Sequence, residues 1–331
     1  MNLTVPAEWA PHRAMWVGFP SHAELWEDNL SPAQVEVAAL ACALAGAGRE
    51  RVKVMVSGKD ALATARELLD GETGVEIVSG VFGDIWLRDT GPIFRSADRA
   101  AAFRFNGWGG KYRLAGDDTV AAGIAAHAGV TLDHNDFVLE GGAVDHDGAG
   151  TVLTTRQCLL NDNRNPGWRP ADAEAALAQA LGVRKVIWLG EGLVNDHTDG
   201  HVDNLARFIA PSVVACPMAW GEDDPNGELY DAAAAALARA TDAEGRPLRV
   251  VRVPSPGRVE DVEGEVIPAS HMNFLIADGA VIVPIYNEAP GALAARALES
   301  AFPDRQVIGL PSRALLTGGG SFHCISQQEP A

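Results

Sequence analysis

The sequence predicts an α/β protein made of five similar units that surround a central pocket. Segments with a strand pattern alternate with segments with a helix pattern along most of the chain. Five polar residues stand near the ends of predicted strands at separations of 51 to 72 residues, namely Asp89, Glu140, His201, Asn273 and Cys324. A unit of that size buries its apolar face only against neighbours, so we expect a radial repeat with one of these residues from each unit lining its centre.

The composition favours one folded domain. The 331 residues are long enough for two domains, but no linker, charge block or shift in composition divides them, so residues 1–331 are expected to form a single catalytic domain. With 47% hydrophobic residues, the chain has ample material for a core. The formal charge of −18 disfavours nucleic acid and anionic membranes as partners and favours a cationic ligand.

The cysteines predict a reduced, cytoplasmic protein. The four of them lie far apart, form no C-x-x-C motif and follow no secretory signal, namely Cys42, Cys158, Cys216 and Cys324. No apolar run approaches the ~18 residues that a membrane-spanning helix needs.

The first third of the chain alternates between strand and helix. Strands are expected at 15–19, 51–56 and 75–78, and helices at 31–45 and 60–69. Ser31 followed by Pro32 predicts the start of the first helix, with Ser31 as its N-cap. Further on, Trp86 and Arg88 share one face of an extended segment, which ends in a Gly-Pro turn after Asp89.

The middle third repeats this order. It is expected to hold a strand at 101–106, a helix at 118–128, a strand-turn-strand segment at 136–155, a helix at 171–181 and a strand at 185–189. The glycine-rich turn that carries Trp108 is too irregular for a phosphate-binding loop, which argues against a nucleotide site. Asp147-Gly148 predicts a hairpin turn, and Glu140 before two glycines is a carboxylate at a strand end beside open backbone.

The last third supplies a candidate base beside a carboxylate. After Gly200, the spacing of His201 and Asp203 on a strand would put both side chains on one face, roughly 7 Å apart along the chain. A satisfied His-Asp pair in the core is the other interpretation. The remaining elements are expected as a helix at 228–240, a strand at 249–253, a strand-turn-strand segment at 269–284, a helix at 291–301 and a strand at 306–310.

A triglycine before a cysteine is the most distinctive pattern of the chain. Gly318 to Gly320 have no Cβ, which lets the backbone take unusual dihedrals and lets a ligand approach it closely. Residues 322–327 are expected to form a short strand that presents an exposed Cys324 thiol as a nucleophile. A buried, inert cysteine is the alternative.

Seven ordered motifs resemble the agmatine deiminase family, which is related to bacterial peptidyl-arginine deiminases. They cover the chain from end to end and are Glu8-Trp-Ala-Pro-His12, Asp84-Ile-Trp-Leu-Arg-Asp-Thr-Gly-Pro92, Phe105-Asn-Gly-Trp-Gly-Gly-Lys111, Leu139-Glu-Gly-Gly142, Thr198-Asp-Gly-His-Val-Asp-Asn204, Ala269-Ser-His-Met-Asn-Phe274 and Gly318-Gly-Gly-Ser-Phe-His-Cys-Ile-Ser-Gln-Gln328. The sequence departs from the family pattern at His271, where Tyr is expected, and at Asp199, where Asn is frequent.

The resemblance implies a fold, a substrate and roles for individual residues. The fold would be a five-bladed α/β propeller of ββαβ units, a pentein, in agreement with the five polar residues. Cys324 would be the nucleophile and His201 the acid and base, with Asp89 and Asp203 holding the guanidinium and Glu140 completing the site. The substrate would be agmatine, a small cationic guanidine, with no metal or organic cofactor, and a homodimer is compatible with the family.

The chemistry of a guanidinium calls for these residue types. The cation is protonated near neutral pH, so a planar fork of carboxylates must hold it before a thiolate attacks its carbon. The remaining substrate contacts are expected from Gly319, from Trp86 and Trp108 by cation–π interaction or else as core packing, and from Asp196. An acidic rim formed by Asp196 or Asp199 would reject the carboxylate of arginine.

Three alternatives remain open. Within the family, the chain would act on peptidyl-arginine or on another guanidine. A metal-dependent amidohydrolase would use His197, His201 and Asp203, although no further His/Cys cluster completes that ligand set. A non-catalytic binder of cationic ligands would keep the carboxylates but would leave the triglycine and Cys324 without a purpose.

Overall fold

Five small mixed sheets stand around a common centre in the computed structural model, which describes residues 4–331. Three-stranded sheets are formed by β4-β5-β6 (Ile93–Ser96, Arg99–Arg104, Thr131–Val138), β7-β8-β9 (Asp145–His146, Thr151–Thr155, Lys185–Leu189), β10-β11-β12 (Arg207–Ala210, Val213–Met218, Arg249–Pro254) and β13-β14-β15 (Leu275–Ile276, Ala280–Ile285, Gln306–Pro311). A four-stranded sheet has the order β16-β1-β2-β3 (Ser326–Pro330, His12–Gly18, Val52–Val56, Val75–Ser79).

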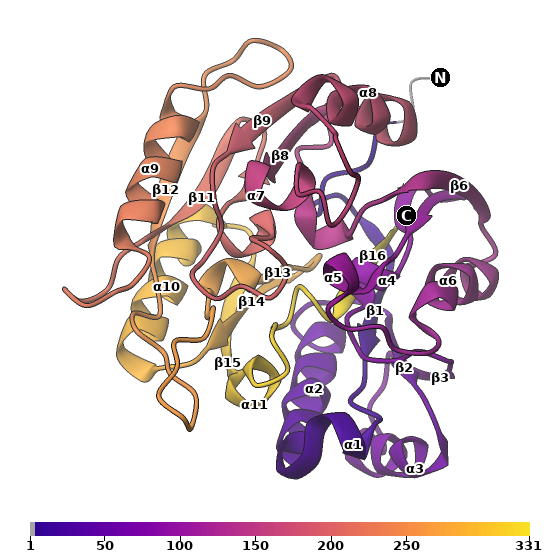
Figure 1. Cartoon of the computed structure of the whole chain (residues 1–331). Coiled ribbons are helices and arrows are strands. Elements are labelled where there is room, and N and C mark those ends of the chain that lie inside the picture. The colour runs from indigo at the N-terminus through magenta and orange to yellow at the C-terminus, as the bar shows by residue number, and fades with distance from the viewer. Residues whose placement is uncertain (1–3) are drawn as a thin grey trace.

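Every sheet repeats one topology. Its first strand pairs antiparallel with the second, and the second pairs parallel with the third. The parallel connection requires a crossover, and a helix supplies it in each case: α2 (Leu30–Ala45), α6 (Val120–Ala128), α8 (Pro170–Leu181), α9 (Gly227–Ala238) and α10 (Glu288–Ala301). These helices lie around the periphery of the molecule (Figure 1). The expected five-bladed α/β propeller of ββαβ units is therefore confirmed.

The two ends of the chain close the ring. The C-terminal strand β16 pairs antiparallel with β1, which places Gln327 opposite Trp16. Glu329 of β16 then receives hydrogen bonds from the Trp16 indole at 3.0 Å and the Lys53 ammonium at 3.0 Å, and it also pairs with Arg13. The last strand of the sequence thus completes the blade that the first strand begins.

The middle strands of the blades carry the core. The residues of β8 are all buried and those of β14 are buried except Ile285, because a strand lies on either side of each and the crossover helix covers one face. The outer strand β15 is intermediate or exposed throughout. The apolar run Ala280–Val283 is therefore explained by burial on both faces.

The ends of several elements differ from the expectations. Ser31 is not an N-cap, because a 3₁₀ turn at Glu27–Asn29 leads directly into α2 and the chain is already helical at Leu30. The Asp147-Gly148 hairpin between β7 and β8 is confirmed. Other helices are α3 (Lys59–Leu68), α5 (Gly107–Gly110), α7 (Arg156–Leu159) and α11 (Arg313–Leu316).

Each of the five polar residues lies in, or directly before, a short helical turn that precedes the first strand of a blade. Asp89 is in α4 (Leu87–Thr90), and Cys324 is in a turn at 322–325. Glu140, His201 and Asn273 precede or end 3₁₀ turns, which are Gly141–Ala143, Val202–Asn204 and His271–Asn273. The strands expected around Asp89, His201 and Cys324 are therefore wrong. Side chains that bind nearby backbone N–H groups take the place of strand pairing at these turns.

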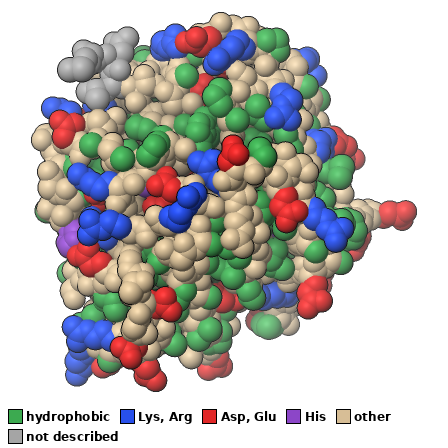
Figure 2. Space-filling model, turned by 180° about the vertical axis from the view of Figure 1, so that it is seen from behind, with side chains coloured by type: hydrophobic (Ala, Val, Ile, Leu, Met, Phe, Trp, Pro, Cys, Tyr) green, Lys and Arg blue, Asp and Glu red, His purple; other side chains and the backbone are tan. Residues whose placement is uncertain are grey.

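The surface charge, like the composition, gives no indication of a partner that needs a basic patch. On the face turned away in Figure 1, acidic and basic side chains are interspersed without a continuous basic patch (Figure 2). Within residues 4–331, no helix has the length and apolar character needed to cross a membrane.

Candidate active site

A cavity of about 260 Å³ opens at the centre of the ring. Aromatic and acidic side chains predominate in its wall, which is made by Leu25, Trp26, Asp84, Trp86, Asp89, Trp108, Tyr112, Leu114, His197, Thr198, Thr317, Gly318, Gly319 and Cys324. No Lys or Arg of the described residues lines it, so the cavity suits a cation with an apolar stem.

Three predicted site residues converge on one glycine. A methyl group on Gly142 would lie 2.6 Å from His201 Nδ1, 2.9 Å from Asp89 Oδ1 and 3.1 Å from Asp203 Oδ2. These contacts are closer than any side chain tolerates, so only glycine fits there. The structure therefore brings Asp89, His201 and Asp203 together, although they come from two different blades.

Asp89 is held in place by two N–H groups. Its Oδ1 accepts a hydrogen bond from the Gly142 backbone at 2.9 Å, and its Oδ2 accepts one from the Trp108 indole at 2.8 Å. Burial, reinforced by the nearby charge of Asp203, raises the pKa of Asp89 despite the compensating charge of His201. The carboxylate thus lines the cavity and receives no hydrogen bond from Lys or Arg among the described residues.

His201 lies behind Asp89, with its Nδ1 3.7 Å from Asp89 Oδ1. Burial alone would lower the pKa of His201, but the neighbouring Asp89, Cys158 and Glu140 raise it well above its usual range. The imidazole is therefore protonated near neutral pH and can donate a proton.

Asp203 belongs to a chain of buried charges. Its Oδ2 is 2.7 Å from His323 Nδ1, and His323 Nε2 is 3.2 Å from Glu8, which pairs in turn with Arg207. Burial would raise the pKa of Asp203, but the hydrogen bond and charge of His323 lower it. Asp203 Oδ1 is buried and has no hydrogen-bond partner in the described part of the chain. Asp203 is therefore an ionised carboxylate with one oxygen free.

Asn273 fixes the position of Cys324. Its Oδ1 accepts hydrogen bonds from the backbone N–H groups of His323 at 2.9 Å and Cys324 at 3.2 Å, while its Nδ2 lies 3.0 Å from Cys324 Sγ. Cys324 Sγ is 3.9 Å from Asp203 Oδ2. The thiol is only 7% exposed, at the cavity wall, so the expectation of an exposed thiol is wrong.

Burial and two carboxylates control the protonation of Cys324. Burial raises its pKa well above the ordinary value, and the charges of Asp203 and Asp89 raise it further. Without a bound cation, the sulfur therefore keeps its proton.

The triglycine is required by the tryptophans beside it. A methyl group on Gly318 would lie 2.7 Å from Trp26, and one on Gly320 would lie 2.6 Å from Trp86 and 3.0 Å from Cys324 Cβ. Gly319 has a φ of +104°, which favours glycine. The loop therefore approaches the aromatic wall more closely than any residue with a side chain could.

Glu140 and its partner Arg164 form a second layer behind His201. Glu140 is 1% exposed and accepts a hydrogen bond from Arg164 Nε at 2.6 Å. The same guanidinium donates to Asp199 at 2.6 Å and to the Thr198 carbonyl at 2.8 Å. Arg164 thereby ties Glu140 to the loop that leads to His201.

The expected acidic rim is not where the sequence placed it. Asp196 does not line the cavity, because its side chain turns back to accept hydrogen bonds from the Thr198 N–H at 2.9 Å and the Thr198 hydroxyl at 2.6 Å. Asp199 is paired with both Lys111 and Arg164. The acidic group that does line the outer cavity is Asp84, which accepts hydrogen bonds from the indoles of Trp26 at 3.0 Å and Trp86 at 2.8 Å.

Sequence reasoning missed several of these residues. Asp84, Arg164 and His323 were visible only as members of motifs or loops, and Asn273 only by its place in the series of five. The metal alternative is not supported by the geometry, because His197 stacks on Tyr112 at the cavity mouth while Asp203 binds His323. Within residues 4–331, His197, His201 and Asp203 are not one of the clusters with metal-binding spacing.

Comparison with known proteins places the chain in a family. The family described as Porphyromonas-type peptidyl-arginine deiminase matches residues 4–330. An agmatine deiminase from Stutzerimonas stutzeri is 40% identical over 99% of this chain and 95% of its own length. A second relative, agmatine deiminase from Pseudomonas aeruginosa, is 38% identical over the same shares.

Solved structures agree over the whole chain. An agmatine deiminase of Enterococcus faecalis superposes with a TM-score of 0.92 at 34% identity, covering 99% of this chain and 95% of that one. A cysteine-to-serine variant of the C. jejuni agmatine deiminase with substrate bound superposes with a TM-score of 0.87 at 26% identity, covering 99% and 96%. With the seven ordered motifs, these matches show that the chain belongs to the Porphyromonas-type peptidyl-arginine deiminase family.

Proposed function

We propose that this chain hydrolyses agmatine to N-carbamoylputrescine and ammonia, through a covalent intermediate on Cys324. The observation that carries the proposal is that Asp89 and Cys324 line a cavity without basic residues, while His201 and Asp203 lie buried directly beside them. The names of the relatives support the same activity, since both curated relatives compared above are agmatine deiminases.

The two carboxylates suit the guanidinium. Asp89 Oδ1 and the unpartnered Asp203 Oδ1 would accept its N–H groups, and the planar cation would lie beside the Cys324 sulfur. Its positive charge would offset the carboxylates that raise the pKa of Cys324, so the thiol would release its proton to solvent as the complex forms. Substrate binding itself would therefore activate the nucleophile.

The reaction then divides into two steps. In the first, the Cys324 thiolate bonds to the central guanidinium carbon, His201 gives its proton to one nitrogen, and that nitrogen leaves as ammonia. In the second, water attacks the resulting thiouronium while His201 takes one of its protons, and the carbon–sulfur bond breaks as the other proton passes to the sulfur, which returns Cys324 as the thiol. Glu140 and Arg164 would keep the imidazole in place during both transfers.

Asp84 is the group best placed to hold the distal amine of agmatine. It lies in the outer cavity wall between two indoles that would cover the methylene chain. Arginine carries a carboxylate next to that amine, and repulsion by Asp84 would disfavour it. This role replaces the one that the sequence suggested for Asp196.

We propose further that residues 1–331 act as one catalytic unit. The site takes residues from several blades, and the blade that follows Cys324 needs both ends of the chain. The four unpaired cysteines suit a cytoplasmic location.

Ammonia release from agmatine, arginine and a blocked arginine amide tests the proposal. We expect kcat/KM to be highest for agmatine by about 10²-fold or more, since one repulsive or unpaired carboxylate costs several kcal/mol. Asp84→Asn should reduce the ratio of kcat/KM for agmatine to kcat/KM for arginine. Asp118→Asn, on an exposed residue outside the cavity wall, should leave this ratio unchanged. If the amide equals or exceeds agmatine, the chain is a peptidyl-arginine deiminase.

A further inference from the structure

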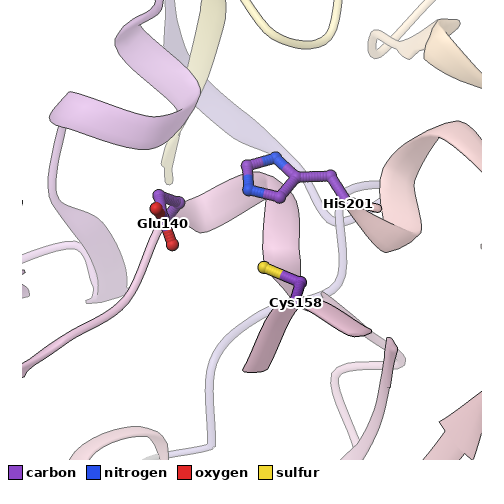
Figure 3. Close-up of side chains that lie close together, drawn as sticks. All are labelled: Glu140, Cys158 and His201. Atoms are coloured by element: carbon purple, nitrogen blue, oxygen red, sulfur yellow. The ribbon is translucent and has the colours of Figure 1, made fainter. Parts of the chain in front are cut away.

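Behind the proposed active site lies a buried group of three potential metal ligands (Figure 3). Glu140 follows β6, Cys158 belongs to α7 and His201 precedes the turn Val202–Asn204. One donor atom from each lies within 4.8 Å of the other two, and all three residues are buried. Figure 3 shows the Cys158 sulfur and the Glu140 carboxylate on the same side of the imidazole.

The two nitrogens of His201 face different surroundings. Nδ1 lies on the side of Asp89, at 3.7 Å, and so belongs to the catalytic side. Nε2 is buried and has no hydrogen-bond partner among the described residues. A buried imidazole nitrogen without a partner is uncommon and calls for an explanation. The proposed reaction uses His201 but leaves this nitrogen without a role, and the Cys158 thiol contributes to it only by raising the pKa of His201.

We propose that Glu140, Cys158 and His201 form an inhibitory site for a thiophilic divalent cation, for which Zn²⁺ is the best match. The proposal rests on the function proposed above, because the effect of the ion would be to remove the proton shuttle. Sulfur, nitrogen and carboxylate oxygen are the ligands that Zn²⁺ prefers. Its usual bond lengths imply ligand separations of roughly 3.3–3.6 Å, so closing the group requires movements of little more than about 1 Å.

The charges around the group are compatible with a cation. Arg164 donates a hydrogen bond to Oε1 of Glu140 and leaves Oε2 available. The Arg164 guanidinium also donates to Asp199. Zinc binding would release one proton from the Cys158 thiol and one from the His201 imidazolium, so that the imidazole binds in its neutral form. Thiolate and carboxylate together would then balance the two charges of the ion, and Arg164 would keep its own partner in Asp199.

An ion bound here would inhibit without entering the substrate cavity. Coordination of His201 would prevent it from giving a proton to the leaving nitrogen and from taking one from water, while Asp84, Asp89 and Asp203 would remain free to bind agmatine. Zinc at Cys324 would instead exclude the substrate. The two sites are therefore distinguishable, because the first lowers kcat and the second raises the apparent KM.

Cobalt binding tests the site without relying on turnover. In the Cys324→Ser protein, Co²⁺ should give a thiolate-to-cobalt charge-transfer band after overnight equilibration. Cys158→Ala in that background should abolish the band, whereas Cys216→Ala, which removes another buried thiol, should leave it unchanged. A band that survives Cys158→Ala, or no band at all, would overturn the site even if the protein proves to be an agmatine deiminase.

Zinc inhibition of turnover tests the predicted effect of the bound ion on catalysis. Zn²⁺ should lower kcat of the wild-type protein, and EDTA should restore it. Cys158→Ala should raise the inhibitory concentration about tenfold or more, as expected for a lost ligand, and Cys158→Ser serves if the alanine variant does not fold. Equal zinc sensitivity of wild type and both variants, or inhibition that agmatine relieves, would assign the effect to Cys324 and contradict the proposal.

Discussion

Asn273 shows how one amide can organise a nucleophile. It receives two backbone N–H groups from the Cys324 turn and directs its own N–H toward both Asn204 Oδ1 and the sulfur. Asn273→Ala would leave the turn without these contacts, and a displacement of about 1 Å costs on the order of 10²-fold in rate. We expect kcat to fall by that amount with a smaller change in KM.

Steady-state kinetics beside thermal unfolding check this expectation. Asn287→Ala is the matched control, because that side chain binds a loop carbonyl away from the cavity. An Asn273 variant with wild-type kcat would show that the turn holds Cys324 without the amide.

The pH dependence of Cys324 alkylation should be the opposite of that of a typical activated thiol, whose pKa is lowered. Because burial and the carboxylates raise its pKa, little thiolate exists near neutral pH in the free protein. The rate of alkylation of Cys324 by iodoacetamide should therefore keep rising with pH beyond about 8.5, the ordinary thiol pKa. Peptide mapping of the modified Cys324 measures the rate, and a plateau near pH 7 would contradict the account.

For single residues, the sequence identified the members of the proposed site better than the side chains that they contact. Cys324, His201, Asp89, Asp203 and Glu140 were named from residue type and motif, and the structure groups them. The roles proposed for Asp84 and Arg164 depend on side-chain directions that residue spacing does not specify. Asp196 illustrates the limit, since its carboxylate binds the next turn of its own loop.

At the scale of elements, the turn before each blade supplies one residue of the proposed site. These turns were predicted as strand ends, because apolar residues flank them on both sides. Side-chain hydrogen bonds to nearby backbone N–H groups favour a turn over a strand there. Asp84 accepts one from the Ile85 N–H at 2.9 Å, and Ser270 accepts one from the Met272 N–H at 3.1 Å. Strand periodicity does not reveal such bonds. The crossover helices and most parallel strands were predicted close to their observed bounds, whereas the strand β11 at Val213–Met218 was not predicted.

The triglycine loop permits a direct test of this element. A Cβ at position 320 would meet Trp86 at 2.6 Å and Cys324 Cβ at 3.0 Å. Gly320→Ala should therefore displace the Cys324 turn and lower kcat/KM for agmatine by on the order of 10²-fold. Gly190→Ala is the control, because no atom lies within 4 Å of a Cβ there. Equal activity of the two variants would mean that the loop adjusts freely.

At the scale of the whole molecule, the spacing of five polar residues was enough to predict a radial repeat. The way in which the ring closes was not predictable from it, because no local pattern links residues 12–18 to residues 326–330. The pairing of β1 with β16 depends on the completed ring, which brings the two ends of the chain together. A long-range contact of this kind is set by topology rather than by propensity.

Glu329 allows the strength of the closure to be measured. Its side chain is 1% exposed and binds Trp16, Lys53 and Arg13 from the N-terminal blade. Glu329→Ala leaves these donors unsatisfied and should lower the free energy of unfolding by about 1–3 kcal/mol. Urea unfolding measures the change, with the exposed Glu24→Ala as a control expected to stay within about 0.5 kcal/mol. Equal stability of the two variants would show that strand pairing alone closes the ring.

The central claim is that agmatine is deiminated through a covalent bond to Cys324, and trapping that bond tests it most directly. Wild-type protein is mixed with saturating agmatine, quenched with acid during turnover and digested for peptide mass spectrometry. The account predicts that the peptide containing Cys324 gains the mass of agmatine less ammonia, that the peptides of Cys42, Cys158 and Cys216 remain unmodified, and that Cys324→Ser forms no adduct and no ammonia. An adduct on another residue, or ammonia release by Cys324→Ser at a rate close to wild type, would contradict it.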